Sequence, residues 1–256
     1  MALRPAAAGR GPLLPPPLYF PDFISPLSSM LKLYIGNKNY SSWSMRSWVL
    51  LKQAGIDFEE VMLRFDAFTP DSQFKTAIGK ISPVAKVPVL VDAGLVIWDT
   101  LAIAEYLAEQ FPDKQLWPAD KAARARAHSV CAEMHSGFSA LRSACPMNIE
   151  ARLPQVGALI WRDQPGERAD LARLVAMWQQ LLKTYGGPLL FGDFSIADAY
   201  FAPVLTRLIT YALPLPPDIL AYLERVVALP GIQAWIDDAL AEQDFRDFEE
   251  PYRLHA

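Results

Sequence analysis

The sequence has no run of basic residues and no long apolar segment. Lys and Arg total 24 against 28 Asp and Glu, a formal net charge of −4. Nucleic acids and anionic lipids are bound through clustered cations, so we expect neither as a partner. A transmembrane helix needs about 20 consecutive apolar residues, which no segment provides. We therefore expect no membrane partner.

Cysteine is scarce, with only Cys131 and Cys145 present. The pattern around them predicts one continuous helix, in which a rise of about 1.5 Å per residue would separate them by roughly 21 Å. Disulfide formation needs Cα atoms within about 7 Å, so this pair cannot form one unless the helix breaks between them. Unpaired cysteines are typical of a reducing compartment, and we expect a cytoplasmic protein.

Metal and nucleotide motifs are also lacking. His128 and His135 are two helical turns apart, about 10.5 Å, which is too far for one zinc ion. We interpret both as structural or surface residues, although His135 faces the expected domain junction, which leaves a minor substrate role open. There is no Walker A sequence and no dinucleotide-binding glycine fingerprint. We expect no metal.

Hydrophobic residues make up 52% of the 256-residue chain, which excludes intrinsic disorder of the whole and allows one large or two small domains. Residues 1–30 differ from the rest because they contain seven prolines, which interrupt any helix there. We interpret residues 1–30 as a disordered, proline-rich extension.

Residues 31–111 alternate between strand-like and helix-like patterns. The pattern predicts the order β-α-β-α-β-β-α, with strands over 31–35, 58–63, 87–91 and 95–98, and helices over 42–54, from about 70, and over 100–110. Asp92-Ala93-Gly94 has the turn chemistry of a hairpin. A hairpin requires antiparallel pairing, so we expect a small α/β domain with a mixed sheet.

After residue 111 the strand signals stop. A linker is expected over 112–119, which contains two prolines, and an all-helical domain over 120–256. The apolar spacing is clearest at Leu171, Leu174, Val175, Trp178, Leu181 and Leu182. We expect Trp178 to be a core residue.

A proline cannot donate to a sheet, so Pro88 must lie at the start of its strand or on a sheet edge. From composition alone a trans peptide bond is favoured there. The surrounding residues 82–90 (SPVAKVPVL), the element order and the pair Asp99-Thr100 together resemble the thioredoxin-like N-terminal domain of the cytosolic glutathione S-transferase superfamily. This resemblance implies a cis Pro88.

The resemblance extends from residue 31 to about 245, because the all-helical second half also fits the family. Ser195-Ile196-Ala197-Asp198 is similar to the family's capping box. A serine at the N-cap and an acidic residue three positions later satisfy each other's backbone groups. We interpret this pair as a folding device and give it no catalytic role.

The start of the first helix is the expected place for chemistry. Helix N-termini stabilise anions, and a hydroxyl adds a charge-assisted hydrogen bond, so a thiol held there loses its proton more easily. Taken alone, serines at a helix start are caps. Residues 41–46 (SSWSMR) resemble the zeta-class pattern Ser-Ser-Cys-Ser-x-Arg, as in zeta-like bacterial members, which implies that Ser41 activates the thiol of glutathione.

The sequence also offers other candidates for the residue that activates the thiol. Ser42 and Ser44 are reserves, and Tyr34 is a rival because other classes of the superfamily use a strand tyrosine; strand alternation does not decide its burial. Trp43 stands in place of the zeta-class cysteine, which puts isomerase activity in doubt.

For glutathione itself, the resemblance assigns the backbone of Val87, next to Pro88, to the cysteinyl segment, and Lys86 to a carboxylate. Asp99 and Thr100 are assigned to the γ-glutamyl end, where an ammonium needs an acidic partner and a carboxylate needs hydroxyl and amide donors. The alternative is that Asp99 and Thr100 are simply an N-cap and a first-turn residue.

The expected function is therefore that of a serine-type glutathione transferase acting on a hydrophobic electrophile, with glutathione as co-substrate. The electrophile pocket is expected from the helical domain around Met134, His135, Phe138 and Arg142. The alternatives are a non-catalytic glutathione-binding or structural protein and, less favoured, a glutathione-dependent isomerase or reductase. The resemblance also implies a homodimer.

Overall fold

The computed structural model describes residues 30–255. The expectation of disorder for residues 1–30 falls almost wholly outside this range. The first part of the described chain contains β1 (Leu31–Ile35), α1 (Ser42–Gln53), β2 (Phe58–Met62), α2 (Gln73–Gly79), β3 (Val89–Asp92), β4 (Leu95–Ile97) and α3 (Thr100–Gln110). The predicted order of elements is confirmed.

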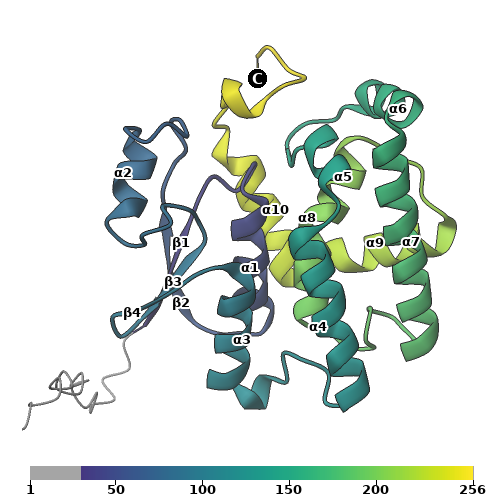
Figure 1. Ribbon diagram of the computed structural model, residues 1–256, viewed down its shortest axis with the longest axis horizontal. Coiled ribbons are helices and arrows are strands. Elements are labelled where there is room, and N and C mark those ends of the chain that lie inside the picture. The colour runs from purple at the N-terminus through teal and green to yellow at the C-terminus, as the bar shows by residue number, and fades with distance from the viewer. Residues whose placement is uncertain (1–29, 256) are drawn as a thin grey trace, which may run out of the picture.

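The second part is helical. It contains η1 (Pro112–Lys114), α4 (Lys121–Ser136), α5 (Ser139–Ala144), α6 (Pro154–Asp163), α7 (Pro165–Tyr185), α8 (Ile196–Thr210), α9 (Pro217–Val227), α10 (Pro230–Glu242) and η2 (Asp247–Glu249). A thioredoxin-like domain followed by an all-helical domain is the fold that the sequence predicts (Figure 1).

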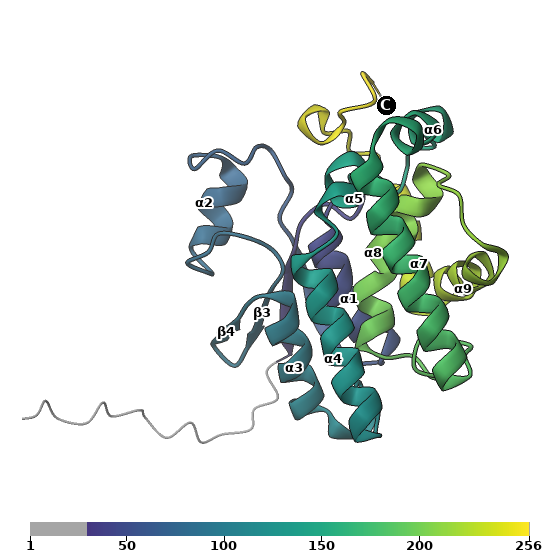
Figure 2. The ribbon, with the colours of Figure 1, turned by 45° about the vertical axis from the view of Figure 1, so that its right-hand side comes forward.

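The sheet has the strand order β2-β1-β3-β4. Strand β1 pairs parallel with β2 and antiparallel with β3, and β3 and β4 form the predicted hairpin. The sheet is therefore mixed, as expected. Figures 1 and 2 show α1 and α3 on the side of the sheet that faces the helical domain, whereas α2 lies on the opposite side.

Alternation along β1 gives the strand two faces. Leu31, Leu33 and Ile35 are buried in the main core with α1 and α3. Tyr34 points the other way and packs against a second cluster under α2, which includes Phe74 and Ile78. The sheet thus separates a large core, shared with the helical domain, from a small one beneath α2.

Helix α1 lies between the sheet and the helical domain (Figure 2). It packs against α3 on the sheet side and against α8 and α10 on the other. Eight of its residues, from Ser44 to Leu51, are buried in succession. Helix α8 is similarly enclosed, and Trp178 on α7 is fully buried, as expected for a core residue.

The prediction of one helix through both cysteines is wrong. Helix α4 ends at Ser136, and Phe138 adopts a left-handed conformation with φ of 55° before α5 begins. A Cβ on Gly137 would lie 2.7 Å from the carbonyl oxygen of Glu133, so the residue at the break must be small. Both cysteines are nevertheless buried and unpaired.

Two sheet-domain elements begin later than the sequence predicts. Strand β3 starts at Val89, directly after Pro88, because the proline nitrogen cannot donate to the ladder. Helix α2 starts at Gln73, because the Ser72 side chain accepts from the Lys75 amide and caps the helix there. Within residues 30–255, no single helix is long and apolar enough to span a membrane, and α9 with α10 reaches that length only across a 77° bend.

The capping box before α8 is present. The Ser195 amide donates to Asp198 Oδ2 at 3.0 Å, while the Leu190 amide and the Tyr222 hydroxyl donate to Oδ1, both at 3.2 Å. Burial raises the pKa of Asp198 to about 6, against the opposing effect of these hydrogen bonds. The carboxylate therefore joins α8, α9 and the loop before α8.

Removing this carboxylate tests its structural role. We expect Asp198→Ala to lower the free energy of unfolding by about 2–4 kcal/mol, because three buried donors lose their acceptor. Ser195→Ala should cost about 1 kcal/mol. Urea denaturation measures both, with Glu224→Ala, an exposed change on α9, as control. An Asp198→Ala protein as stable as the control would contradict the role.

Candidate functional site

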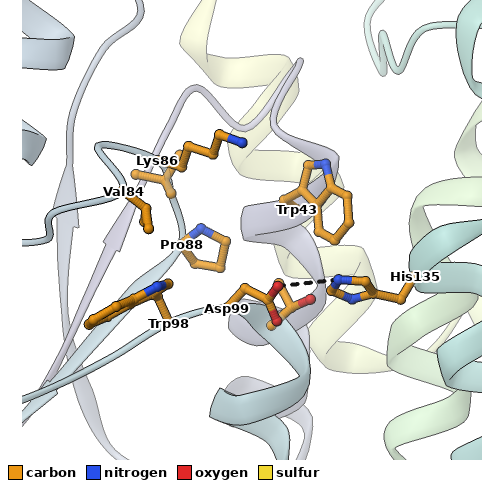
Figure 3. Close-up of a pocket in the computed structure, with 9 residues that line it drawn as sticks. Trp43, Val84, Lys86, Pro88, Trp98, Asp99 and His135 are labelled. Carbon is orange, nitrogen blue, oxygen red and sulfur yellow. Dashed lines mark ion pairs between the residues drawn. The ribbon is translucent and has the colours of Figure 1, made fainter.

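The predicted glutathione-binding residues meet in one cavity of about 400 Å³ at the domain boundary. Figure 3 shows Lys86, Pro88 and Trp98 on the sheet side, facing Trp43 of α1 and His135 of α4. The lining residues are Trp43, Val84, Lys86, Val87, Pro88, Trp98, Asp99, Thr100 and His135. All five predicted glutathione-binding residues are thus brought together.

A second cavity, of about 190 Å³, adjoins the first because both are lined by Trp43, Lys86 and Val87. Its remaining lining residues come from the start of α1, from α2 and the loop before it, and from the C-terminal segment: Tyr40, Ser41, Ser42, Phe65, Phe68, Phe74, Lys75 and Glu249. The two cavities form a binding region about the N-terminus of α1.

Ser41 is the N-cap residue of α1, but its side chain makes no capping hydrogen bond. Its Oγ instead donates to Ser44 Oγ at 2.7 Å, and Ser44 Oγ accepts from the Gly36 amide at 3.2 Å. The Ser41 hydroxyl is therefore not the helix cap that the sequence taken alone suggests. Ser41 lines the second cavity with a hydroxyl that is held by one neutral partner.

The reserve residues occupy different positions. Ser44 is fully buried, and Ser42 Oγ accepts from Arg207 at 3.3 Å while lining the second cavity. Tyr34 packs beneath α2 and lines neither cavity. Among these four residues, only Ser41 and Ser42 line the binding region.

The segment before β3 contributes to both cavities. The Val87–Pro88 peptide bond is cis, as the resemblance implies. Lys86 and Val87 line both cavities, which places their backbone between the start of α1 and the Asp99 region. An extended peptide bound along this segment would pass from one cavity into the other.

Asp99 and Thr100 are cap and cavity residues at the same time. Asp99 is the N-cap of α3, where its side chain accepts from the Leu101 amide at 3.2 Å, yet 54% of the side chain is exposed. Its second oxygen lies 3.2 Å from His135 Nε2 of the helical domain. The two explanations offered by the sequence are compatible, and the contact with His135 was not anticipated.

The residues expected to form the electrophile pocket are dispersed. Met134 is fully buried, and Phe138 is almost so, at the break between α4 and α5. Arg142 lies 5.0 Å from the centre of the Trp43 ring, and His135 makes an edge contact with the same ring at 5.0 Å. Of these four residues, only His135 lines one of the two cavities, and Trp43 contacts both His135 and Arg142.

A second arginine beneath Trp43 was missed. Arg46 is buried, with its guanidinium 4.4 Å from the Trp43 ring and 4.6 Å from the Tyr200 ring. Burial lowers the pKa of Arg46 to about 10 and that of Arg207 to about 9. Both pKa values stay above neutral pH, so both guanidinium groups carry positive charge, and the region beneath Trp43 is electropositive.

The C-terminal segment forms part of the wall of the second cavity, which the sequence did not predict. Glu250 is buried and accepts from Tyr40 at 2.7 Å and from Asn148 at 2.7 Å. Phe248 makes an edge contact with Phe68, so the intervening Glu249 is fixed against the cavity. Burial and the neighbouring Glu250 raise the pKa of Glu249 to about 7.

No group of His, Cys, Asp and Glu side chains suited to a metal ion occurs within residues 30–255. The polar groups described above instead suit a small ligand with several charged ends. Lysine and helix amides offer positive charge at Lys86 and α1, while Asp99 offers negative charge.

Comparison with known proteins agrees with this arrangement. Residues 40–110 match the family described as glutathione S-transferase, N-terminal domain, and residues 122–238 match the corresponding C-terminal domain. The chain is 30% identical over 185 residues to glutathione S-transferase 1 of Dianthus caryophyllus, covering 70% of this chain and 78% of that protein.

Two further relatives are informative. A probable maleylacetoacetate isomerase of Caenorhabditis elegans is 30% identical over 192 residues, which are 72% of this chain and 82% of the relative. A glutathione transferase homolog from Burkholderia, solved with bound glutathione, is 27% identical with a TM-score of 0.61 and covers 82% of this chain and 98% of its own. The chain therefore belongs to the glutathione S-transferase family.

Proposed function

We propose that this protein is a serine-type glutathione transferase, near the zeta class, that joins the thiol of glutathione to an electrophilic carbon. The observation that carries the proposal is Ser41. Its hydroxyl lies at the N-terminus of α1, caps nothing, and lines a cavity that continues to Val87 and Lys86. A solved relative that binds glutathione supports the choice of thiol.

In this proposal glutathione extends through both cavities. Its γ-glutamyl end lies at Asp99 and Thr100, its cysteinyl backbone pairs with Val87 beside cis-Pro88, and Lys86 faces its glycyl carboxylate. Each pairing matches a charge or a donor of the peptide to an opposite charge or an acceptor of the protein. The thiol is then directed to the start of α1.

Chemistry follows from the helix terminus. Ser41 rotates its hydroxyl from Ser44 to the sulfur, and the α1 amides add partial positive charge, so the thiol releases its proton to water more easily. The thiolate attacks the electrophilic carbon, forming the C–S bond as the leaving group departs with its electron pair. The electropositive side around Arg46 and Arg142 disfavours a cationic electrophile.

The alternatives receive unequal support. An isomerase is favoured by the Caenorhabditis elegans relative, although Trp43 replaces the cysteine of the zeta-class pattern. A reductase would need a nucleophilic cysteine at the start of α1, whereas both cysteines are buried elsewhere and burial raises the pKa of Cys145 to about 12. A non-catalytic binding protein would bind glutathione without turnover.

A homodimer and a cytoplasmic location are part of the same proposal. The homodimer is inferred from the family's architecture, and two-fold pairing is the commonest assembly. Two free cysteines support the location.

Replacing Ser41 tests the thiol-activating role. We expect Ser41→Ala to lower kcat/KM by roughly 10²–10³-fold, because a donor to the developing thiolate is lost. Affinity for glutathione should stay within about threefold, since the hydroxyl does not hold the peptide. Conjugation kinetics and the ultraviolet absorbance of bound thiolate across pH measure both effects.

The control for this change is Ser129→Ala, an exposed serine on α4. Ser42→Ala decides between the two hydroxyls that adjoin the cavity. If Ser41→Ala keeps full activity at pH 6.5 while Ser42→Ala loses it, the role belongs to Ser42.

Changing Asp99 to Asn separates its two roles, because Asn caps helices as well as Asp but carries no charge. We expect KM for glutathione to rise about tenfold while kcat changes less than about twofold, since the ammonium loses a charged partner. Thermal stability should be retained. Asp120→Asn, the N-cap of α4, is the matched control; equal KM values in both variants would make Asp99 a cap alone.

A further inference from the structure

The second cavity contains a carboxylic acid that the proposed mechanism does not use. Glu249 belongs to η2, after α10, and lines this cavity together with Ser41 and Ser42. Among the described residues, no other Asp or Glu lines it. The Glu249 side chain is partly buried and makes no hydrogen bond and no ion pair within residues 30–255. An acid without a partner, beside the hydroxyls at the start of α1, is free to exchange a proton.

The two neighbours of Glu249 in sequence hold it in this place. Phe248 makes an edge contact with the Phe68 ring, with the ring centres 5.4 Å apart, on the loop before α2. Glu250 is buried and accepts from the Tyr40 hydroxyl at 2.7 Å. In Figure 1 the segment after α10, drawn in yellow, lies between α2 and α5. Glu249 is therefore fixed in the cavity wall by contacts that leave its own carboxyl unbound.

The charged and titratable groups around the cavity leave Glu249 as its proton acceptor. Lys75 of α2 donates to a backbone carbonyl oxygen at 2.8 Å, and Lys86 is assigned to the glycyl carboxylate in the proposed function. Burial raises the pKa of Tyr40 to about 12, so the phenol stays protonated. Burial and the charge of Glu250 raise the pKa of Glu249 to about 7. The other charged side chains of its segment bond elsewhere: Asp244, Arg246, Asp247 and Arg253.

We infer that Glu249 takes up the proton of the glutathione thiol when the thiolate forms at the start of α1. The inference rests on the proposed function and adds a destination for the proton. A water occupies about 30 Å³ in the liquid, so a cavity of about 190 Å³ has room for one beside the peptide. Such a water connects the sulfur to the carboxylate.

The transfer balances without any further reactant. The S–H bond of the peptide breaks and its electron pair stays on sulfur. The water accepts this proton and passes another of its own to the carboxylate, where an O–H bond forms on Glu249. The thiolate then forms the C–S bond as the leaving group departs with its electron pair. Glu249 returns the proton to solvent when the product leaves.

Electrostatics favour this destination. A thiolate and an ionised Glu249 would place two negative charges in one small cavity, and like charges disfavour each other. Transfer leaves a single charge on the sulfur, where the Ser41 hydroxyl and the α1 amides stabilise it. Above about pH 7 the free site holds an ionised carboxylate that can accept the proton. Below that pH Glu249 is already protonated, so the thiol must lose its proton to the solvent.

The test counts thiolates and released protons separately as the full chain binds glutathione. Ultraviolet absorbance gives the thiolates, and an indicator dye in weak buffer gives the protons. S-methylglutathione has no thiol, so its binding measures the protons exchanged by all other groups, which are subtracted. At pH 7.5 we expect thiolates to exceed released protons by about half or more per bound peptide, because Glu249 is largely ionised before binding and protonated afterwards.

Replacing Glu249 by glutamine keeps the size of the side chain and removes the acceptor. In Glu249→Gln the thiolates and the released protons should agree within about a tenth per bound peptide. Asp247→Asn is the matched control, because Asp247 is an exposed acid of the same segment that accepts from the Phe248 amide. It should behave as the wild type. An excess that persists in Glu249→Gln, or no excess in the wild type, would overturn the inference.

The pH titration of the bound thiolate is a second measurement. Because sulfur and carboxyl interact as a coupled pair, the wild-type absorbance should rise in two steps, about one pH unit or more apart. Glu249→Gln should show a single step. A purely structural role for Glu249 would give a single step in both proteins, and that result would overturn the inference.

Failure of the proposed function would look different from failure of the inference. Glutathione would then form no thiolate on the wild-type protein at any pH up to 9, and the inference would fall with the function. Thiolate formation in the wild type without an excess over released protons would leave the proposed function intact and contradict the role of Glu249 alone.

Discussion

Helix α1 packs against both domains, because it is buried against the sheet on one side and against α8 and α10 on the other. A helix enclosed in this way has only its ends available to a ligand. Inside this packing, Ser44 Oγ accepts from the Gly36 amide. The N-terminus of α1, with the macrodipole directed toward the cavities, is therefore where charge can be stabilised.

The two domains contribute different kinds of groups to the site. The sheet domain provides backbone and short polar side chains at fixed positions, through cis-Pro88 and the start of α3. The helical domain provides His135, Tyr200 and the arginines, whose positions depend on how α4 and α8 pack against α1. Small changes in interdomain packing would alter the charge of the site and leave its backbone unchanged.

The order of elements in the sheet domain was predictable from sequence, because β1 alternates with period two and Gly55 ends the first helix. Residues 82–90 and the pair Asp99-Thr100 were predictable as a group through the family resemblance. The break at Gly137 was not, because apolar spacing continues across it. Nor were Tyr200 and Glu249, whose relation to the site depends on the packing of α8 and on a C-terminal segment without regular pattern.

The hydrogen bond between Tyr40 and Glu250 joins residues 210 positions apart. Tyr40 immediately precedes Ser41, so one wall of the binding region depends on a residue that is synthesised 210 positions later. At a translation rate of about 5–20 residues per second, roughly 10–40 s separate the two residues on the ribosome. During that interval the binding region is unfinished. The second cavity is complete only once Glu250 has reached Tyr40, and a contact of such long sequence separation slows formation of the site.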